Sequence, residues 1–198
     1  MKSWDVIVIG SGAAGFAAAV TACCKGLSVL MLEKAPQFGG TSAISGGAVW
    51  IHDSDQARTM TTDDSQQAIK TYLRTIIGEP NYRQDLIEAF ISSGREALAF
   101  LEKEGAVKYS LRPLSPDYYP DEPGAVDVGR ALEVVEFDGR KLGEYFRDLR
   151  SPPPGMLLFG GMMVNRVDIQ HFLDLRRSLR SITHCGKLLL RYGRDRLK

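Results

Sequence analysis

The stretch that decides the fold is Trp4-Asp5-Val6-Ile7-Val8-Ile9-Gly10-Ser11-Gly12-Ala13-Ala14-Gly15, in which an apolar run leads directly into the pattern G-x-G-x-x-G. Val6 to Ile9 has no polar break, which suits a parallel strand buried on both faces. Gly10 allows a tight turn, Gly12 lets a pyrophosphate approach the backbone, and Gly15 lets the next helix pack closely. The free N–H groups of that helix would face the phosphate. The stretch therefore predicts a dinucleotide-binding turn.

The residues after the turn continue as a helix, a second strand and an acid. Ala13 to Lys25 is alanine-rich and compatible with a helix, Gly26 suits its end, and Ser28 to Leu32 is an apolar strand. Glu33 then follows Gly10 at roughly the 20-residue spacing of an acid that accepts hydrogen bonds from the adenosine ribose. A carboxylate there would repel a 2′-phosphate. The alternative is a structural βαβ turn with a solvent-facing Glu33.

A second glycine-rich run follows this acid, Lys34-Ala35-Pro36-Gln37-Phe38-Gly39-Gly40-Thr41-Ser42-Ala43-Ile44-Ser45-Gly46-Gly47-Ala48-Val49-Trp50. Its glycines and small hydroxyl residues let backbone amides approach a diphosphate, where larger side chains would collide. A nicotinamide-dependent dehydrogenase has no need for such a run. An ordinary Gly/Ser loop is the alternative interpretation.

Glu33-Lys34, Gly39-Gly40-Thr41-Ser42 and Ser45-Gly46-Gly47 together resemble the flavoprotein superfamily of fumarate reductase and succinate dehydrogenase. The resemblance implies an FAD cofactor. Succinate dehydrogenases attach FAD through a histidine in this region, and none occurs between Glu33 and Trp50, so we expect non-covalent FAD. His52 is expected to be a loop residue, although it could approach the site. The predicted cofactor-binding residues are Gly10, Ser11, Gly12, Ala13, Ala14, Gly15, Glu33, Lys34, Gly39, Gly40, Thr41, Ser42, Ser45, Gly46 and Gly47.

Three later stretches resemble the 3-ketosteroid dehydrogenase branch of that superfamily. They are Ser115-Pro116-Asp117-Tyr118-Tyr119-Pro120, Asp127-Val128-Gly129-Arg130-Ala131-Leu132 and Phe137-Asp138-Gly139-Arg140-Lys141-Leu142-Gly143. In this branch the first tyrosine of such an Asp-Tyr-Tyr lines the active site, so the resemblance implies a catalytic role for Tyr118. A phenol has a pKa of about 10, which makes it a better donor or relay than a base. The alternative is that Tyr118 and Tyr119 only pack within a proline-framed loop.

The resemblance implies an oxidoreductase that desaturates a 3-oxosteroid-like hydrophobic ketone and passes electrons to an external acceptor. A base would remove the proton beside the carbonyl, and flavin would accept a hydride from the neighbouring carbon. One alternative is a fumarate-reductase-like enzyme acting on a small carboxylate, for which Arg130 and Arg140 are candidates. Each of these arginines is more simply a surface or packing residue. A non-catalytic remnant is the other alternative.

We predict an α/β fold, with a Rossmann-like βαβ FAD-binding unit followed by a mostly helical segment. The fold is expected to be incomplete relative to the family, as in an N-terminal portion, with apolar faces of both strands exposed. The predicted division is 1–60 for part of the FAD-binding domain, 61–150 for a helical and loop region contributing to the active site, and 151–198 for a proline-rich break and a basic helical segment. Further predicted elements are helices over Asp63–Ile77, Arg83–Glu104 and Lys141–Leu149, and a strand over Val107–Leu111.

Composition excludes several other classes of protein. The 198 residues carry a formal net charge of +1, with 44% hydrophobic and 25% charged residues, as in ordinary globular domains. We therefore expect no nucleic-acid partner. We also expect no integral membrane segment, because glycines interrupt the uncharged stretch Val6–Cys24. Cys23, Cys24 and Cys185 form neither a disulfide framework nor a metal-binding pattern, and a cytoplasmic protein is expected.

Overall fold

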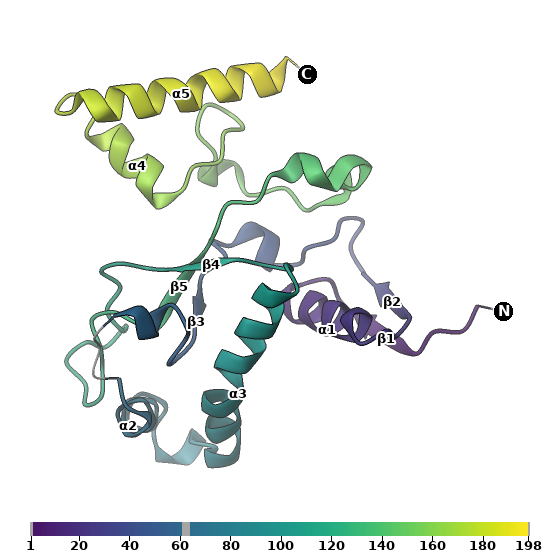
Figure 1. The fold of residues 1–198 in the computed structure, drawn as a ribbon, viewed down its shortest axis with the longest axis vertical. Helices are drawn as coiled ribbons and strands as arrows, with labels where there is room; N and C mark the ends of the chain where they lie inside the picture. The colour runs from purple at the N-terminus through teal and green to yellow at the C-terminus, as the bar shows by residue number, and fades with distance from the viewer. Residues whose placement is uncertain (1, 61–63, 198) are drawn as a thin grey trace. The chain divides into compact units, whose positions relative to one another are not determined.

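The computed structural model describes residues 2–60 and 64–197, and the chain divides into two compact units, 1–150 and 151–198. Figure 1 labels their helices and strands. The first unit contains β1 (Val6–Ile9), α1 (Ala13–Cys24), β2 (Val29–Leu32), the 3-10 turn η1 (Ser42–Ile44), β3 (Val49–Trp50), η2 (Ala57–Thr59), α2 (Gln66–Ile77), η3 (Glu79–Asn81), α3 (Gln84–Lys103), β4 (Tyr109–Leu111), β5 (Ala131–Val134) and η4 (Gly139–Asp148). The second unit contains η5 (Pro154–Met156), α4 (Arg166–Leu173) and α5 (Leu179–Arg196).

The chain opens with a βαβ unit. β1 and β2 are parallel neighbours, with Val6 opposite Val29, and α1 lies against both strands (Figure 1). The Gly10 N–H donates to the carbonyl oxygen of Leu32 at 2.7 Å, which extends the pairing beyond β1. After α1 ends, Gly26 takes a φ of +81°, a backbone conformation that glycine adopts without strain. The predicted Rossmann-like unit is confirmed.

One face of this two-stranded sheet is covered and the other is exposed. Val8 is buried, whereas the side chains of Ile7, Ile9 and Leu32 are 58%, 86% and 48% exposed. The apolar run of β1 favours a strand that is buried on both faces, and this expectation is therefore wrong. The reason is that, within the described residues, β1 pairs only with β2 and α1 packs on one side. The expected exposure of apolar strand faces is confirmed.

A second, antiparallel sheet has the strand order β3-β5-β4. Leu132 in β5 lies opposite both Val49 and Leu111 and is fully buried. A core beside it is formed by Ile69, Tyr72, Leu73 and Ile91 of α2 and α3. The sheet joins one strand from before residue 60 with two strands from after it, so these segments share one compact unit.

The helices of the first unit follow the sequence pattern, with shifted ends. α2 begins two residues after Asp64, because the Ser65 side chain accepts a hydrogen bond from the Ala68 N–H and caps the helix. Asp63, at which the predicted helix begins, lies outside the described residues. The helix predicted after Lys141 is instead a 3-10 segment interrupted at Gly143, whose φ of 55° and ψ of −129° are non-helical.

The second unit is built from a pair of helices. Asn165 and Asp168 form a reciprocal capping box at the start of α4. Asp168 also accepts a hydrogen bond from His184 Nε2 of α5 at 2.7 Å, and the His171 and His184 rings lie 4.2 Å apart. The expected basic helix is α5, which buries Cys185. Among the described helices, none is both long enough and apolar enough to cross a membrane.

Candidate functional site

The glycines of the first glycine-rich turn differ in how close their neighbours lie. A Cβ added at Gly15 would lie 1.9 Å from the carbonyl oxygen of Gly10, so Gly15 is required for packing of α1 against the turn. A Cβ added at Gly12 would meet only Ser42 Oγ, at 3.8 Å. Gly12 therefore borders open space at the beginning of α1, where a helix N-terminus favours an anion. Gly10 has a φ of +94°, which fits the tight turn.

Ser11 connects this turn to the acid and to the second glycine run. Its side chain is buried, and its N–H and hydroxyl both donate to Glu33 Oε2, at 2.9 and 2.5 Å. The Ser11 hydroxyl oxygen in turn accepts a hydrogen bond from the Gly39 N–H at 2.9 Å. The other carboxylate oxygen of Glu33 accepts from the Ala35 N–H at 2.9 Å. These bonds hold the Glu33 carboxylate at the end of β2.

The same bonds keep Glu33 ionised. The Ala35 N–H, together with the hydroxyl and N–H of Ser11, lowers the pKa of Glu33 from 4.5 to about 2. A carboxylate anion has more lone pairs than these three donors use, so it can still accept a hydrogen bond from a ribose hydroxyl. Its charge would repel a phosphate at the same place.

This pKa shift predicts a pH dependence of stability. Because the folded-state pKa of Glu33 is lowered, its contribution should be complete above pH 4.5 and should be lost as pH falls towards about 2. Urea unfolding of the wild type and Glu33→Gln between pH 2 and pH 7 measures this contribution. We expect the difference in midpoint to be constant above pH 4.5 and to shrink below it. A difference that grows on acidification would contradict the assignment.

The second glycine run packs against the first turn at its Gly39-Gly40 end. Gly40 has a φ of +55°, and a Cβ added there would lie 3.1 Å from the Gly12 Cα. Ser42 Oγ accepts a hydrogen bond from the Ala13 N–H at 3.0 Å, so a side chain of the second run caps the first N–H of α1. The two runs together form a cradle made largely of backbone, which fits the diphosphate of a dinucleotide.

The far end of the second run belongs to the other sheet. Ser45 Oγ accepts from the Gly47 N–H at 3.1 Å, and a Cβ added at Gly47 would lie 2.8 Å from a methyl group of Val134 in β5. Gly46, which lies between Ser45 and Gly47 in the chain, is exposed. The other predicted cofactor residues are on the surface near the cradle, as shown by the exposure of Ala13, Ala14, Lys34 and Thr41. The second run thus leads from the first glycine-rich turn to the antiparallel sheet.

The structure places the Asp-Tyr-Tyr segment in the loop between β4 and β5. Tyr118 is 95% exposed and Tyr119 is 59% exposed, whereas Asp117 is buried. The Tyr119 N–H donates to the hydroxyl oxygen of Tyr72 at 3.3 Å. The side chain of Tyr118 is therefore displayed on the surface of the described chain, and its catalytic role stays a prediction.

A buried ion network lies directly beneath this loop. Arg130 is 1% exposed and contacts Asp64 and Asp117, with guanidinium nitrogen to carboxylate oxygen distances of 2.5 and 2.6 Å. His52 is buried as well, and its Nδ1 lies 2.9 Å from Asp64 Oδ2. Of the two expected roles of Arg130, a surface or a packing arginine, the structure shows the packing one, whereas Arg140 is exposed and pairs with Asp138. Sequence reasoning missed the network because its four members are each at least 12 residues apart in the chain.

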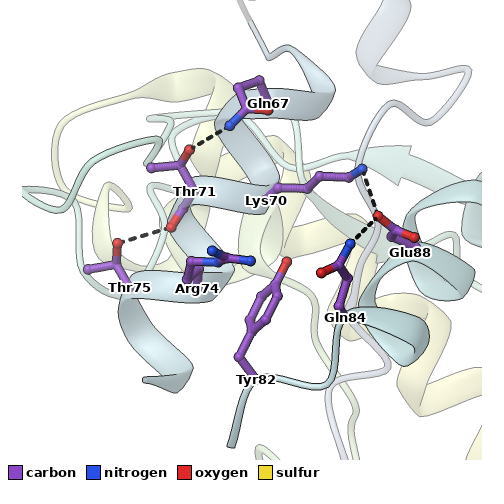
Figure 2. A pocket seen from close by; sticks show the side chains of 8 residues that line it. All are labelled: Gln67, Lys70, Thr71, Arg74, Thr75, Tyr82, Gln84 and Glu88. Atoms are coloured by element: carbon purple, nitrogen blue, oxygen red, sulfur yellow. Dashed lines mark hydrogen bonds and ion pairs between the residues drawn. The ribbon is translucent and has the colours of Figure 1, made fainter. Parts of the chain in front are cut away.

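A polar pocket of about 310 Å³ lies elsewhere, between α2 and the start of α3. Figure 2 shows Lys70 pointing across it to Glu88, whose carboxylate is 3.3 Å from the ammonium group. Its lining residues are Gln67, Lys70, Thr71, Arg74, Thr75, Tyr82, Gln84 and Glu88. None of them is a predicted site residue, and this lining does not suit an apolar ketone.

Comparison with known proteins gives consistent matches along the chain. The FAD binding domain family matches residues 5–191. The 3-oxosteroid 1-dehydrogenase of Mycolicibacterium smegmatis is 36% identical over 190 residues, which are 96% of this chain and 33% of that protein. The 4-oxocyclohex-2-ene-1-carboxylate 5-dehydrogenase of Sinomonas cyclohexanicum is 36% identical over 187 residues, covering 94% of this chain and 31% of that protein.

A solved structure agrees with these relatives. The crystal structure of 3-ketosteroid delta1-dehydrogenase from Sterolibacterium denitrificans, in complex with 1,4-androstadiene-3,17-dione, matches with a TM-score of 0.85 and 35% identity. The match covers 100% of this chain and 35% of that chain. The chain thus spans about a third of the length of the relatives that it matches.

Proposed function

This chain belongs to the FAD binding domain family, and from that membership we propose that it holds FAD non-covalently in the cradle formed by its two glycine-rich runs. In this proposal the Glu33 carboxylate accepts hydrogen bonds from the adenosine ribose. The diphosphate lies over Gly12 at the N-terminus of α1, beside Ser42. The flavin end follows the second run towards Ser45-Gly46-Gly47. The observation that carries the proposal is the open space at Gly12, bounded by Gly40 and Ser42.

The activity we propose is desaturation of a ring ketone, with 3-oxosteroids as the first substrate class. The similarity to a steroid dehydrogenase over the whole chain supports this class. A smaller oxocyclohexene carboxylate is the second candidate, because a relative named for that substrate is equally identical. Bound FAD would supply the acceptor for a hydride. Tyr118 would contribute its phenol Oη as a donor or proton relay near the reacting ketone.

A fumarate-reductase-like activity fits the described residues less well. Such an enzyme needs cationic side chains that reach a small dicarboxylate. The guanidinium group of Arg130 already donates to Asp64, to Asp117 and to the carbonyl oxygen of Gly124. Arg140 donates to Asp138 through Nε and Nη2. We therefore place the ring-ketone proposal first, with an external electron acceptor and a cytoplasmic location as parts of it.

The cofactor proposal is tested by incubating the purified chain with FAD, desalting it, and recording the visible spectrum. We expect retained flavin absorbance in the wild type and its loss in Gly12→Asp, because an aspartate would place a negative charge beside the diphosphate. Far-UV circular dichroism of both proteins serves as the folding control. A folded wild type that retains no flavin would contradict the proposal and favour a non-catalytic remnant.

The substrate proposal is tested on the flavin-loaded chain under anaerobic conditions. One arm adds 4-androstene-3,17-dione, a second adds a 4-oxocyclohexene carboxylate, and a third mixes succinate with the protein. Loss of flavin absorbance with the steroid alone supports the first substrate class, and loss with the smaller ketone alone supports the second. Bleaching by succinate alone would contradict the ring-ketone proposal.

A further inference from the structure

The loop between β4 and β5 is fixed at several points although it is displayed on the surface. At its base the Arg112 N–H donates to the carbonyl oxygen of Ala131 at 3.0 Å. Further along, Asp117 and Val126 face each other, because the Asp117 N–H donates to Val126 O and the Val126 N–H donates to Asp117 Oδ2, at 3.0 and 3.1 Å. Asp117 therefore closes the loop on itself, one residue before the exposed Tyr118.

The Asp117 carboxylate is also attached to the body of the first unit. Its Oδ1 accepts a hydrogen bond from Trp50 Nε1 at 2.8 Å, and its Oδ2 accepts one from Arg130 Nη1 at 2.6 Å. Trp50 belongs to β3, which pairs with β5. The side chain next to Tyr118 is thus bound to a sheet strand and to a buried cation, while Tyr118 itself is 95% exposed.

Arg130 is held in turn by a second carboxylate. Its Nε and Nη2 donate to the two oxygens of Asp64 at 3.0 and 2.5 Å, in the forked geometry that a lysine does not reproduce. The guanidinium carbon lies 5.5 and 5.4 Å from the ring centroids of Trp50 and Tyr72. His52 Nδ1 contacts Asp64 Oδ2, the same oxygen that accepts from Arg130 Nε. We call His52, Asp64, Asp117 and Arg130 the buried clamp.

Gly124 fixes the far side of the loop. A Cβ added at Gly124 would lie 2.2 Å from the carbonyl oxygen of Ala68, so the loop backbone lies directly on α2. The Gly124 carbonyl oxygen accepts a hydrogen bond from Arg130 Nη2 at 2.9 Å. Arg130 therefore touches both the carboxylate that precedes Tyr118 and the backbone on the opposite side of the same loop.

We propose that Asp117 and Arg130 are positioning residues for Tyr118. A buried ion pair is often no more stabilising than apolar packing of the same volume, but its directed hydrogen bonds permit only one arrangement of the groups. The buried clamp thus restrains the backbone of an exposed loop on both sides of Tyr118, and so fixes the position from which the Tyr118 side chain extends. This inference rests on the proposed function, in which Tyr118 faces the ketone.

The clamp is tested first without cofactor, in the full chain. We expect Asp117→Asn and Arg130→Lys to be cleaved by chymotrypsin after Tyr118 about 10-fold faster than wild type, because proteolysis follows the population of the released loop. Asp121→Asn makes the same chemical change at an exposed position of this loop and is the matched control. Mass spectrometry identifies the cut sites. If both clamp variants were cleaved at the rate of Asp121→Asn, the claim that Asp117 and Arg130 restrain this loop would be contradicted.

A spectroscopic readout separates loop release from unfolding. In a Trp4→Phe background, Trp50 is the remaining tryptophan, and it stacks on Phe90 with ring centroids 6.3 Å apart. Asp117→Asn keeps an oxygen that can accept from Trp50 Nε1. We therefore expect this variant to retain helical circular dichroism and a blue-shifted Trp50 emission while it is cleaved faster. Faster cleavage with Trp50 emission of an unfolded chain in both clamp variants would overturn a local positioning role.

The catalytic purpose is tested with flavin-loaded protein and 4-androstene-3,17-dione. We expect Asp117→Asn to retain flavin as the wild type does and to be bleached about 10-fold more slowly at saturating steroid, since a misplaced group lowers the rate of the reacting complex. An unchanged bleaching rate despite a released loop would overturn the positioning role. A wild type that retains flavin but is not bleached by the steroid would instead contradict the proposed function. The chymotrypsin cleavage rates would then still show whether Asp117 and Arg130 hold the loop in place.

Discussion

Gly15→Ala is expected to disrupt the first glycine-rich turn and to weaken FAD binding strongly. The added Cβ would lie 1.9 Å from the carbonyl oxygen of Gly10 and 3.0 Å from its carbon, so backbone atoms rather than a flexible side chain must move. Overpacking of this kind costs about 1–3 kcal/mol and more where the backbone cannot yield. We expect a loss of about 3 kcal/mol in the free energy of unfolding, and a loss of FAD affinity of about 100-fold.

Gly12→Ala is the matched comparison, because the two glycines stand in the same turn. At Gly12 the φ of −75° is open to any residue, and the new Cβ would be 3.8 Å from Ser42 Oγ. We expect stability to fall by only about 1 kcal/mol, mainly from replacing glycine at the N-cap position. FAD affinity should still fall about 10-fold, since the methyl group enters the space assigned to the diphosphate. Urea unfolding and FAD titration measure the two effects separately.

This pair of variants distinguishes a packing glycine from a ligand-facing one. The assignment of Gly12 would be contradicted if Gly12→Ala bound FAD as tightly as wild type. Equal stability of Gly15→Ala and wild type would contradict the close approach of α1 to the turn.

Arg130→Met is expected to destabilise the first unit by about 3–5 kcal/mol, because the change leaves two buried carboxylates without their cation. The side chains of Arg130, Asp64 and Asp117 are only 1%, 7% and 2% exposed, so water does little to replace the lost donors. Methionine fills a similar volume, which keeps the cavity small. Urea unfolding at neutral pH, followed by circular dichroism, measures the loss.

The same substitution should be less harmful in acid. Burial opposes ionisation of Asp64, but hydrogen bonds from His52 and Arg130 hold its pKa below the usual 3.8. A lowered folded-state pKa contributes stability above pH 3.8 that is lost as pH falls below it. The difference between wild type and Arg130→Met should therefore be largest at neutral pH and should decrease on acidification.

Arg83→Met provides the control for loss of an arginine in an ion pair. Arg83 and Asp85 are 67% and 64% exposed, and such surface pairs contribute about 0–1 kcal/mol. An Arg130→Met protein that unfolds at the same urea concentration as Arg83→Met would show that the buried network is dispensable for stability.

The βαβ unit and its glycine turn could be predicted because each part has a local cause. An apolar β-branched run favours a strand, glycines permit the turn, and an alanine-rich stretch favours a helix over a few residues. Positive φ at Gly10, Gly26 and Gly40 agrees with this local logic. The position of Glu33 at the end of β2 follows from the same order of elements.

The position of Ser42 on the first N–H of α1 depended on the tertiary structure. So did the hydroxyl of Ser11, which joins Glu33 to Gly39, and the burial of Arg130 between Asp64 and Asp117. Each of these contacts joins chain segments whose separation in space is set only after the helices and strands have packed. Local backbone preferences act between near neighbours in the chain, whereas hydrogen bonds and ion pairs depend on distance and direction in space.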